Sequence, residues 1–144
     1  MRDTYVMRKL VTGIDENGQS CVLEETLVGP PGSGASFYET PSSPPPPRPA
    51  GRGEFVDIGP PAGIARWLVV PMEPGYEFGM HYTDTIDFDT ILAGSIELTL
   101  DDGTHALEAG DCVVVAGVDH AWKAGPDGCT LSVMFLGTPP PESP

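Results

Sequence analysis

The stretch Gly75–Gly94, GYEFGMHYTDTIDFDTILAG, carries the most information about the fold of this chain. It is rich in Tyr, Phe, Thr and Ile, which favour β-strands. Side chains at alternate positions share one face of a strand, so we expect His81, Thr83 and Asp87 to point the same way. Such a polar face inside an otherwise apolar domain needs a partner or a purpose.

Strand-like runs separated by Gly, Asp and Pro continue on both sides of this stretch. The runs that we expect to form strands are 66–70, 88–92, 95–100, 104–107, 112–115 and 129–136. The sequence Asp101-Asp102-Gly103 is typical of a hairpin turn. Residues 20–28 fit an early strand or a short helix, and we favour the strand. Helical periodicity is missing elsewhere, so the sequence predicts an all-β sandwich or small barrel.

The charge balance excludes some classes of function. The 144 residues include 7 Lys or Arg and 21 Asp or Glu, which gives a formal net charge of −14. This length predicts a single domain. A nucleic-acid-binding protein needs a basic patch to neutralise phosphates, and an anionic membrane surface would repel this chain. We therefore expect a small-molecule partner, with no nucleic acid and no membrane.

The cysteines and the N-terminus predict a cytoplasmic protein. Cys21, Cys112 and Cys129 are odd in number and form no Cys-x-x-Cys pair, so we expect neither a disulfide framework nor a structural zinc cluster. The sequence holds no apolar run long enough for a transmembrane helix, and no apolar region follows the basic residues near Met1. The cytoplasm is the default compartment for such a chain.

The 18 glycines and 17 prolines divide the chain into four predicted regions. Residues 1–28 form an N-terminal extension with edge strands, and 29–53 a long Pro/Gly-rich loop of polyproline character. Residues 54–137 form the β-barrel, and 138–144 a flexible tail.

A second histidine-bearing stretch follows at Gly110–Trp122, GDCVVVAGVDHAW. If His120 converges with His81 and Asp87, the group could hold iron, manganese or zinc. The same residues could form a metal-free acid–base pair, or Asp87 could simply satisfy two buried histidines. Trp122 shares the parity of His120 and is a candidate pocket residue or a core residue.

Both stretches resemble the motifs of the cupin superfamily. The first motif of that family is matched in spacing from Gly75 through His81 and Asp87 to Gly94, and the second begins at Gly110-Asp111 and reaches His120. The resemblance covers about residues 66–137 and implies a single jelly-roll barrel with its site in the mouth. Thr83 stands where the family has a second metal-binding histidine, and Asp87 stands where it has Glu.

The resemblance implies a small-molecule enzyme with His81, Asp87 and His120 as catalytic residues. We favour a lyase or isomerase that decarboxylates, dehydrates or tautomerises a carbonyl or carboxylate metabolite. The same three residues are the expected ligands of one divalent metal (Fe, Mn, Zn or Ni), with no organic cofactor. The alternatives are a non-haem Fe(II) dioxygenase and a non-catalytic binding protein. The family also implies a homodimer.

The remaining polar and aromatic residues receive weaker interpretations. Thr83, Tyr82 and Trp122 are candidates for substrate binding, and His105 is expected at the surface. The residues expected in the core are Trp67, Met72, Met80 and Met134. The acids expected to be solvated are Asp84, Asp89, Asp101 and Asp102.

Overall fold

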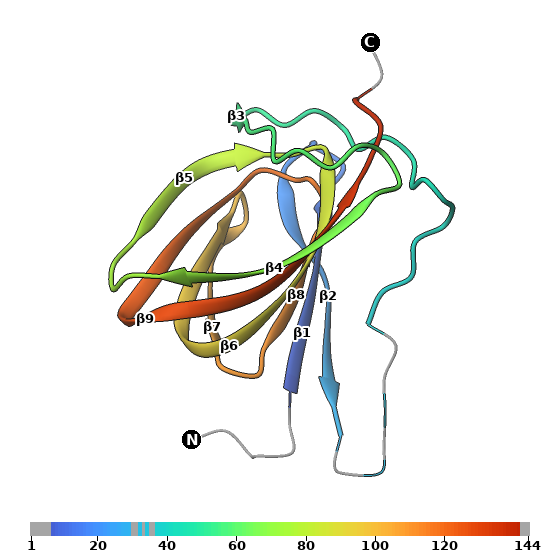
Figure 1. Ribbon diagram of the computed structural model, residues 1–144. Coiled ribbons are helices and arrows are strands. Elements are labelled where there is room, and N and C mark those ends of the chain that lie inside the picture. The colour runs from blue at the N-terminus through green and yellow to red at the C-terminus, as the bar shows by residue number, and fades with distance from the viewer. Residues whose placement is uncertain (1–6, 30–31, 33, 35–36, 142–144) are drawn as a thin grey trace.

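The protein is an all-β jelly-roll barrel, as the sequence predicts. The computed structural model describes residues 7–29, 32, 34 and 37–141 (Figure 1). Within these ranges the chain forms strands and no helix. The strands are β1 Met7–Ile14, β2 Ser20–Val28, β3 Glu54–Phe55, β4 Ala65–Met72, β5 Glu77–Tyr82, β6 Thr85–Leu100, β7 Gly103–Glu108, β8 Cys112–Val115 and β9 His120–Gly137. The alternative of a helix at 20–28 is therefore excluded, because β2 spans those residues.

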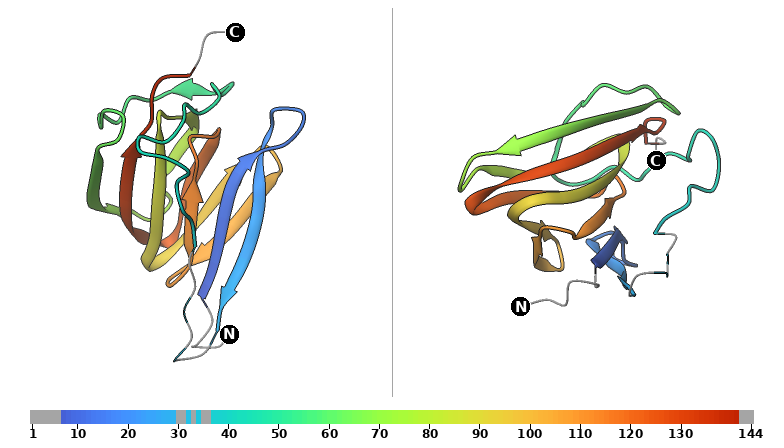
Figure 2. Two further views of the ribbon diagram at one scale, coloured as in Figure 1. Left: turned by 90° about the vertical axis from the view of Figure 1, so that its right-hand side faces the viewer. Right: turned by 60° about the horizontal axis from the view of Figure 1, so that its bottom comes forward.

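The two longest strands, β6 and β9, form the spine of the barrel. They pair antiparallel with each other, and β6 also pairs with β7 and β8 while β9 pairs with β4 and β5. The sequence predicts two short strands on either side of Ala93-Gly94, whereas the structure has one strand that bends there through two irregularities in register. Gly94 has φ +76°, and a Cβ at this position would collide with the carbonyl oxygen of Gly128. The glycine thus lets one strand serve both halves of the barrel (Figure 2).

The apolar core lies inside the barrel. Alternate residues of β6 and β9 are its main contributors, joined by β1, β7 and β8. Its best-buried members are Leu10, Ile91, Ile96, Leu98, Leu100, Leu107, Val113 and Val115. Of the four residues expected in the core, Met72 packs against it, while Met80 is half-buried.

The expectation that Trp67 and Met134 belong to the core is wrong. Their side chains are 74% and 40% exposed, and the two residues lie opposite each other on β4 and β9. They occupy the outer face because their neighbours Leu68 and Val133 occupy the inner one. Trp67 donates from its indole Nε1 to Ser132 Oγ at 2.7 Å, which satisfies its polar atom at the surface.

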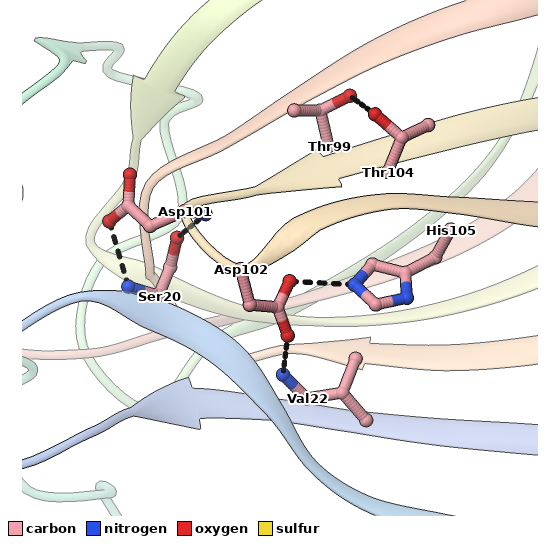
Figure 3. Close-up of polar contacts among 7 residues, drawn as sticks. All are labelled: Ser20, Val22, Thr99, Asp101, Asp102, Thr104 and His105. Carbon is pink, nitrogen blue, oxygen red and sulfur yellow. Dashed lines mark hydrogen bonds and ion pairs between the residues drawn. The ribbon is translucent and has the colours of Figure 1, made fainter.

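The N-terminal hairpin joins the barrel in two ways. β1 runs parallel to β8 and antiparallel to β2, so it extends the sheet within its own chain. The predicted β6–β7 turn then holds β2 (Figure 3): Asp101 accepts from the Ser20 N–H, and Asp102 accepts from the Val22 N–H. His105 lies at the surface as expected, partly covered, with its Nε2 2.7 Å from Asp102 Oδ1.

The Pro-rich region does more than link the hairpin to the barrel. Its described residues between Val28 and Glu54 form no helix or strand. Residues 48–58, which we call the strap, run across one end of the barrel, where β3 pairs parallel with β5 (Figure 1). Arg48 Nε donates to the carbonyl of Ala116 at 2.9 Å. The buried Asp119 accepts from two strap amides, those of Arg52 at 2.8 Å and Gly53 at 2.9 Å.

Candidate functional site

Two histidines from neighbouring strands face each other at the centre of the site. His81 of β5 and His120 of β9 are paired in register, and their ring centroids are 4.2 Å apart. Each ring contacts a backbone carbonyl through Nδ1: His81 that of Gly79 at 2.8 Å, and His120 that of Val118 at 2.7 Å. A carbonyl oxygen only accepts, so Nδ1 carries the proton in both rings. Nε2 of each neutral ring therefore keeps its lone pair.

Burial keeps both imidazoles neutral. Loss of hydration lowers the pKa of His81, partly offset by its bond to the Gly79 carbonyl. For His120, burial and the neighbouring His81 lower the pKa to about 3. The pair is thus a hydrogen-bond acceptor at neutral pH rather than a cation.

A line of hydroxyls leads to the predicted carboxylate. Thr85 Oγ1 donates to Asp87 Oδ1 at 2.6 Å, and Thr83 Oγ1 lies 2.9 Å from Thr85 Oγ1. Because the single proton of Thr85 goes to Asp87, the bond between the two hydroxyls uses the proton of Thr83. Burial raises the pKa of Asp87 to about 7, against a smaller lowering effect of the Thr85 bond. Asp87 is therefore able to hold or release a proton near neutral pH.

A second carboxyl group lies beside the first, and the expectation that Asp89 is solvated is wrong. Asp89 is 3% exposed, because it has the parity of Asp87 and lines the same cavity. Its Oδ1 has no hydrogen-bond partner among the described residues. Burial and the charge of Asp87 raise the pKa of Asp89 well above its ordinary value. The same parity argument that singled out Asp87 would have found this residue.

These groups line one cavity of ≈ 150 Å³. Five of the six predicted site residues contribute to it: His81, Thr83, Asp87, His120 and Trp122. The sixth, Tyr82, points to the other side of β5 and packs its ring against Phe55, with centroids 5.5 Å apart.

Most of the cavity wall is apolar and comes from several parts of the fold. β4 supplies Val70 and Met72, β5 supplies Phe78, and β9 adds Leu131, Val133 and Phe135 to Trp122. The strap contributes Val56 and Ile58, which sequence reasoning missed. No local pattern marks them, because they reach the cavity only through the contacts that place the strap.

The predicted metal centre requires three side chains that converge on one ion. No three His, Cys, Asp or Glu side chains among the described residues are placed to share one ion. His81 and His120 each present a free Nε2 of the kind that binds metals, but Asp87 is held by Thr85 and does not complete a three-ligand set with them. The residues therefore do not fit the expected ligand set, and a divalent metal stays a prediction from the sequence.

Comparison with known proteins identifies the class of domain. Residues 68–136 match the family model described as the cupin domain. The chain thus contains a cupin domain, and the match includes every strand from β5 to β8 together with the site histidines.

The curated relatives are fungal. Phomopsin biosynthesis cluster protein C' of Diaporthe leptostromiformis is 41% identical over 56 residues, which is 38% of this chain and 30% of the relative. Oryzines biosynthesis cluster protein J of Aspergillus oryzae is 36% identical over 55 residues, or 38% of this chain and 31% of that protein. The match thus spans less than a third of the length of either relative.

Among solved structures, a cupin superfamily protein from Desulfitobacterium hafniense is 18% identical. The match covers 50% of this chain and 66% of that one, with a TM-score of 0.46. Separately, the described part of the chain has no helix long and apolar enough to cross a membrane.

Proposed function

We propose that the protein is a small-molecule enzyme of the lyase or isomerase type, which acts on a substrate with a hydroxyl or enol group beside a carbonyl. One observation carries this proposal: two imidazole Nε2 lone pairs and a carboxyl group that titrates near neutral pH line the same cavity. The similarity to proteins named for biosynthesis clusters supports a role in small-molecule metabolism.

The proposed reaction divides the proton transfer between Asp87 and the histidines. In a tautomerisation, protonated Asp87 delivers its proton to the substrate carbon while His81 Nε2 takes the proton of the enol hydroxyl as the carbonyl forms. His120, which is a weak base because burial and His81 lower its pKa to about 3, accepts a hydrogen bond from the second hydroxyl that the enol of a 2-hydroxy ketone carries. The bonds from Nδ1 to the backbone keep both rings in place throughout. No step passes through a metal.

The test is solvent exchange at carbon. The protein is incubated in D2O with a panel of small 2-hydroxy ketones and 1,3-diketones, and deuterium incorporation and product formation are followed by NMR. We expect exchange that falls at least tenfold in Asp87→Asn and His81→Gln. The matched control is His105→Gln, which removes a histidine outside the cavity and should leave the rate unchanged. Equal rates in all three variants, or no exchange above buffer, would overturn the proposal.

The two alternatives give different results in the same samples. A binding protein without activity is stabilised against heat by a panel compound but returns it unchanged. A dioxygenase gives oxygen uptake after anaerobic loading with ferrous iron. The observation behind this alternative is two Nε2 lone pairs in one cavity, without Asp87 as a third ligand. Metal analysis of the loaded protein with and without His81→Gln checks it.

The cytoplasm is the location that we propose. Cys21, Cys112 and Cys129 are all free thiols in the structure. Burial raises the pKa of the Cys129 thiol, so it is a core residue of low reactivity. Three unpaired cysteines suit a reducing compartment. Fractionation of the producing cell, with the protein detected by antibody, checks the location.

A further inference from the structure

The charges around the cavity are unusual for a site that takes an anionic metabolite. Among the described residues, its ionisable lining groups are two carboxyls and two histidines, with no Lys or Arg side chain. Both histidines are kept neutral by burial. A carboxylate or phosphate that entered would lose its hydration without gaining a cation, and would lie beside Asp87 and Asp89.

The arginines near the mouth have other contacts. Arg48 donates to the carbonyl of Ala116, and Arg52 donates from its guanidinium to the carbonyl of Asn17 at 2.8 Å. Arg66 of β4 pairs in register with Phe135 of β9. Its side chain is exposed and lies beside Gly59, the residue after the strap, so it does not line the cavity. The net charge of −14 also repels anions from the whole molecule.

Asp89 indicates what the cavity accepts instead. Its Oδ1 is buried and has no hydrogen-bond partner among the described residues, although the residue lines the cavity. A buried polar atom without a partner is costly, and a bound molecule with an N–H or O–H group would satisfy it. Asp87, in contrast, already accepts a bond from Thr85.

The apolar walls determine the size and shape of the apolar part of the ligand. A cavity of ≈ 150 Å³ has room for about one six-membered ring or a branched chain. A neighbouring hollow of ≈ 470 Å³ shares Val70, Met72, Phe78 and Trp122 with it, so a longer molecule can extend outward along the same wall. The strap residues Val56 and Ile58 add to this apolar surface.

We infer that the site selects an uncharged or cationic amphiphile, with an apolar ring or branched chain next to an N–H or O–H group that donates to Asp89, and rejects anions. This inference rests on the proposed function only for the use of the cavity as a substrate site. It narrows the substrates expected from the sequence, since it favours carbonyl compounds without a carboxylate.

The experiment uses three probes with the same ring: benzyl alcohol, benzylamine and benzoate. Binding to the full chain is measured at pH 7.5 by NMR titration, at low salt and at 0.5 M salt. We expect the alcohol and the amine to bind at least tenfold more tightly than benzoate at both salt concentrations. Benzoate binding equal to that of the alcohol would overturn the inference. If Arg66→Ala then loses benzoate binding, the anion is bound by Arg66 near the mouth of the cavity.

Two variants test the role of Asp89 itself. Asp89→Asn keeps a carbonyl acceptor but cannot ionise beside a bound ammonium group. We therefore expect benzyl alcohol binding within threefold of the wild type and benzylamine binding at least fivefold weaker. Asp101→Asn, the same substitution on an exposed turn outside the cavity, should affect neither. Equal benzylamine binding in both variants would exclude Asp89 as the contact. If Asp89→Asn fails to fold, the three probes on the wild type still decide between anions and other ligands.

These measurements need no turnover, so their failure is distinct from that of the proposed function. Selective binding without deuterium exchange supports the ligand class and contradicts the reaction. Deuterium exchange on an anionic substrate, combined with tight benzoate binding, supports the reaction and contradicts the ligand class.

Discussion

His81 and His120 stand directly opposite each other on β5 and β9, and each binds through Nδ1 the carbonyl of the residue two positions before it. The two rings are thus held in the same way by the backbone just before them. Their centroids are 4.2 Å apart in a buried site, so a proton on either ring would be close to the other. The arrangement keeps both rings neutral, so protonation of either histidine in acid lowers the stability of the folded protein.

The first prediction concerns pH and stability. His120 has a pKa of about 3 in the folded protein, below its ordinary 6.5, so between these values the unfolded chain binds more protons and acid destabilises. Asp87 has a pKa of about 7, above its ordinary 3.8, so between these values the folded protein binds more protons and acid stabilises. His81 shifts in the direction of His120, and Asp89 in that of Asp87.

Single substitutions should therefore tilt the stability profile in opposite directions. Relative to the wild type, Asp87→Asn should lose stability as the pH falls from 6.5 to 4, and His120→Gln should gain it. Each slope is up to about 1.4 kcal/mol per pH unit. Urea unfolding between pH 4 and 7, with a chelator present, measures both. Profiles parallel to that of the wild type would contradict the shifts.

The second prediction concerns the bend in β6. Gly75 and Gly94 have similar φ angles of +73° and +76°, but a Cβ at Gly75 meets nothing within 4 Å, whereas one at Gly94 collides with the carbonyl of Gly128. Gly75→Ala should cost about 1 kcal/mol through backbone conformation alone. Gly94→Ala should cost at least about 2 kcal/mol more, because β6 and β9 must move apart. The free energy of unfolding in urea checks both, and equal losses would show that the close approach is unimportant.

The barrel and most of its site could be predicted from sequence because both depend on local rules. Alternation along β5, β6 and β9 fixes which side chains point inward, so His81, Asp87 and His120 could be assigned to one cavity. Asp89 follows from the same rule, whereas its residue type alone predicts a solvated side chain. Residue type alone also predicts Trp67 in the core, whereas alternation puts it on the outer face.

The strap could not be predicted in this way. Its irregular backbone has no periodicity, and its position depends on Asp119, a carboxylate 67 positions after Arg52 in the chain. Val56 and Ile58 therefore reach the cavity through a contact between distant segments. Sequence spacing within either segment carries no signal for it.

The third prediction concerns this contact. Asp119→Ala removes the acceptor of two strap amides and should lower stability by about 2 kcal/mol. It should also speed tryptic cleavage after Arg52. The control is Asp57→Ala, which removes an exposed strap carboxylate bonded only to the amide of Gly59 among the described residues. Cleavage at the same rate in both variants would show that Asp119 does not hold the strap.

The last prediction locates the homodimer expected from the sequence. We propose that two copies meet through the outer face of β4, β9 and β6, where Trp67 and Val69 are exposed beside Met134 and Leu92. The outward positions of these strand segments carry no charged side chain. On a chain of net charge −14, two copies can approach there without placing like charges together.

Trp67→Lys should therefore produce a monomer at concentrations where the wild type sediments as a dimer. Leu23→Lys, at another exposed position on β2, should leave the dimer intact. A monomeric wild type would contradict this interface. Dissociation only in Leu23→Lys would also contradict it, and would indicate that the dimer forms through the N-terminal hairpin.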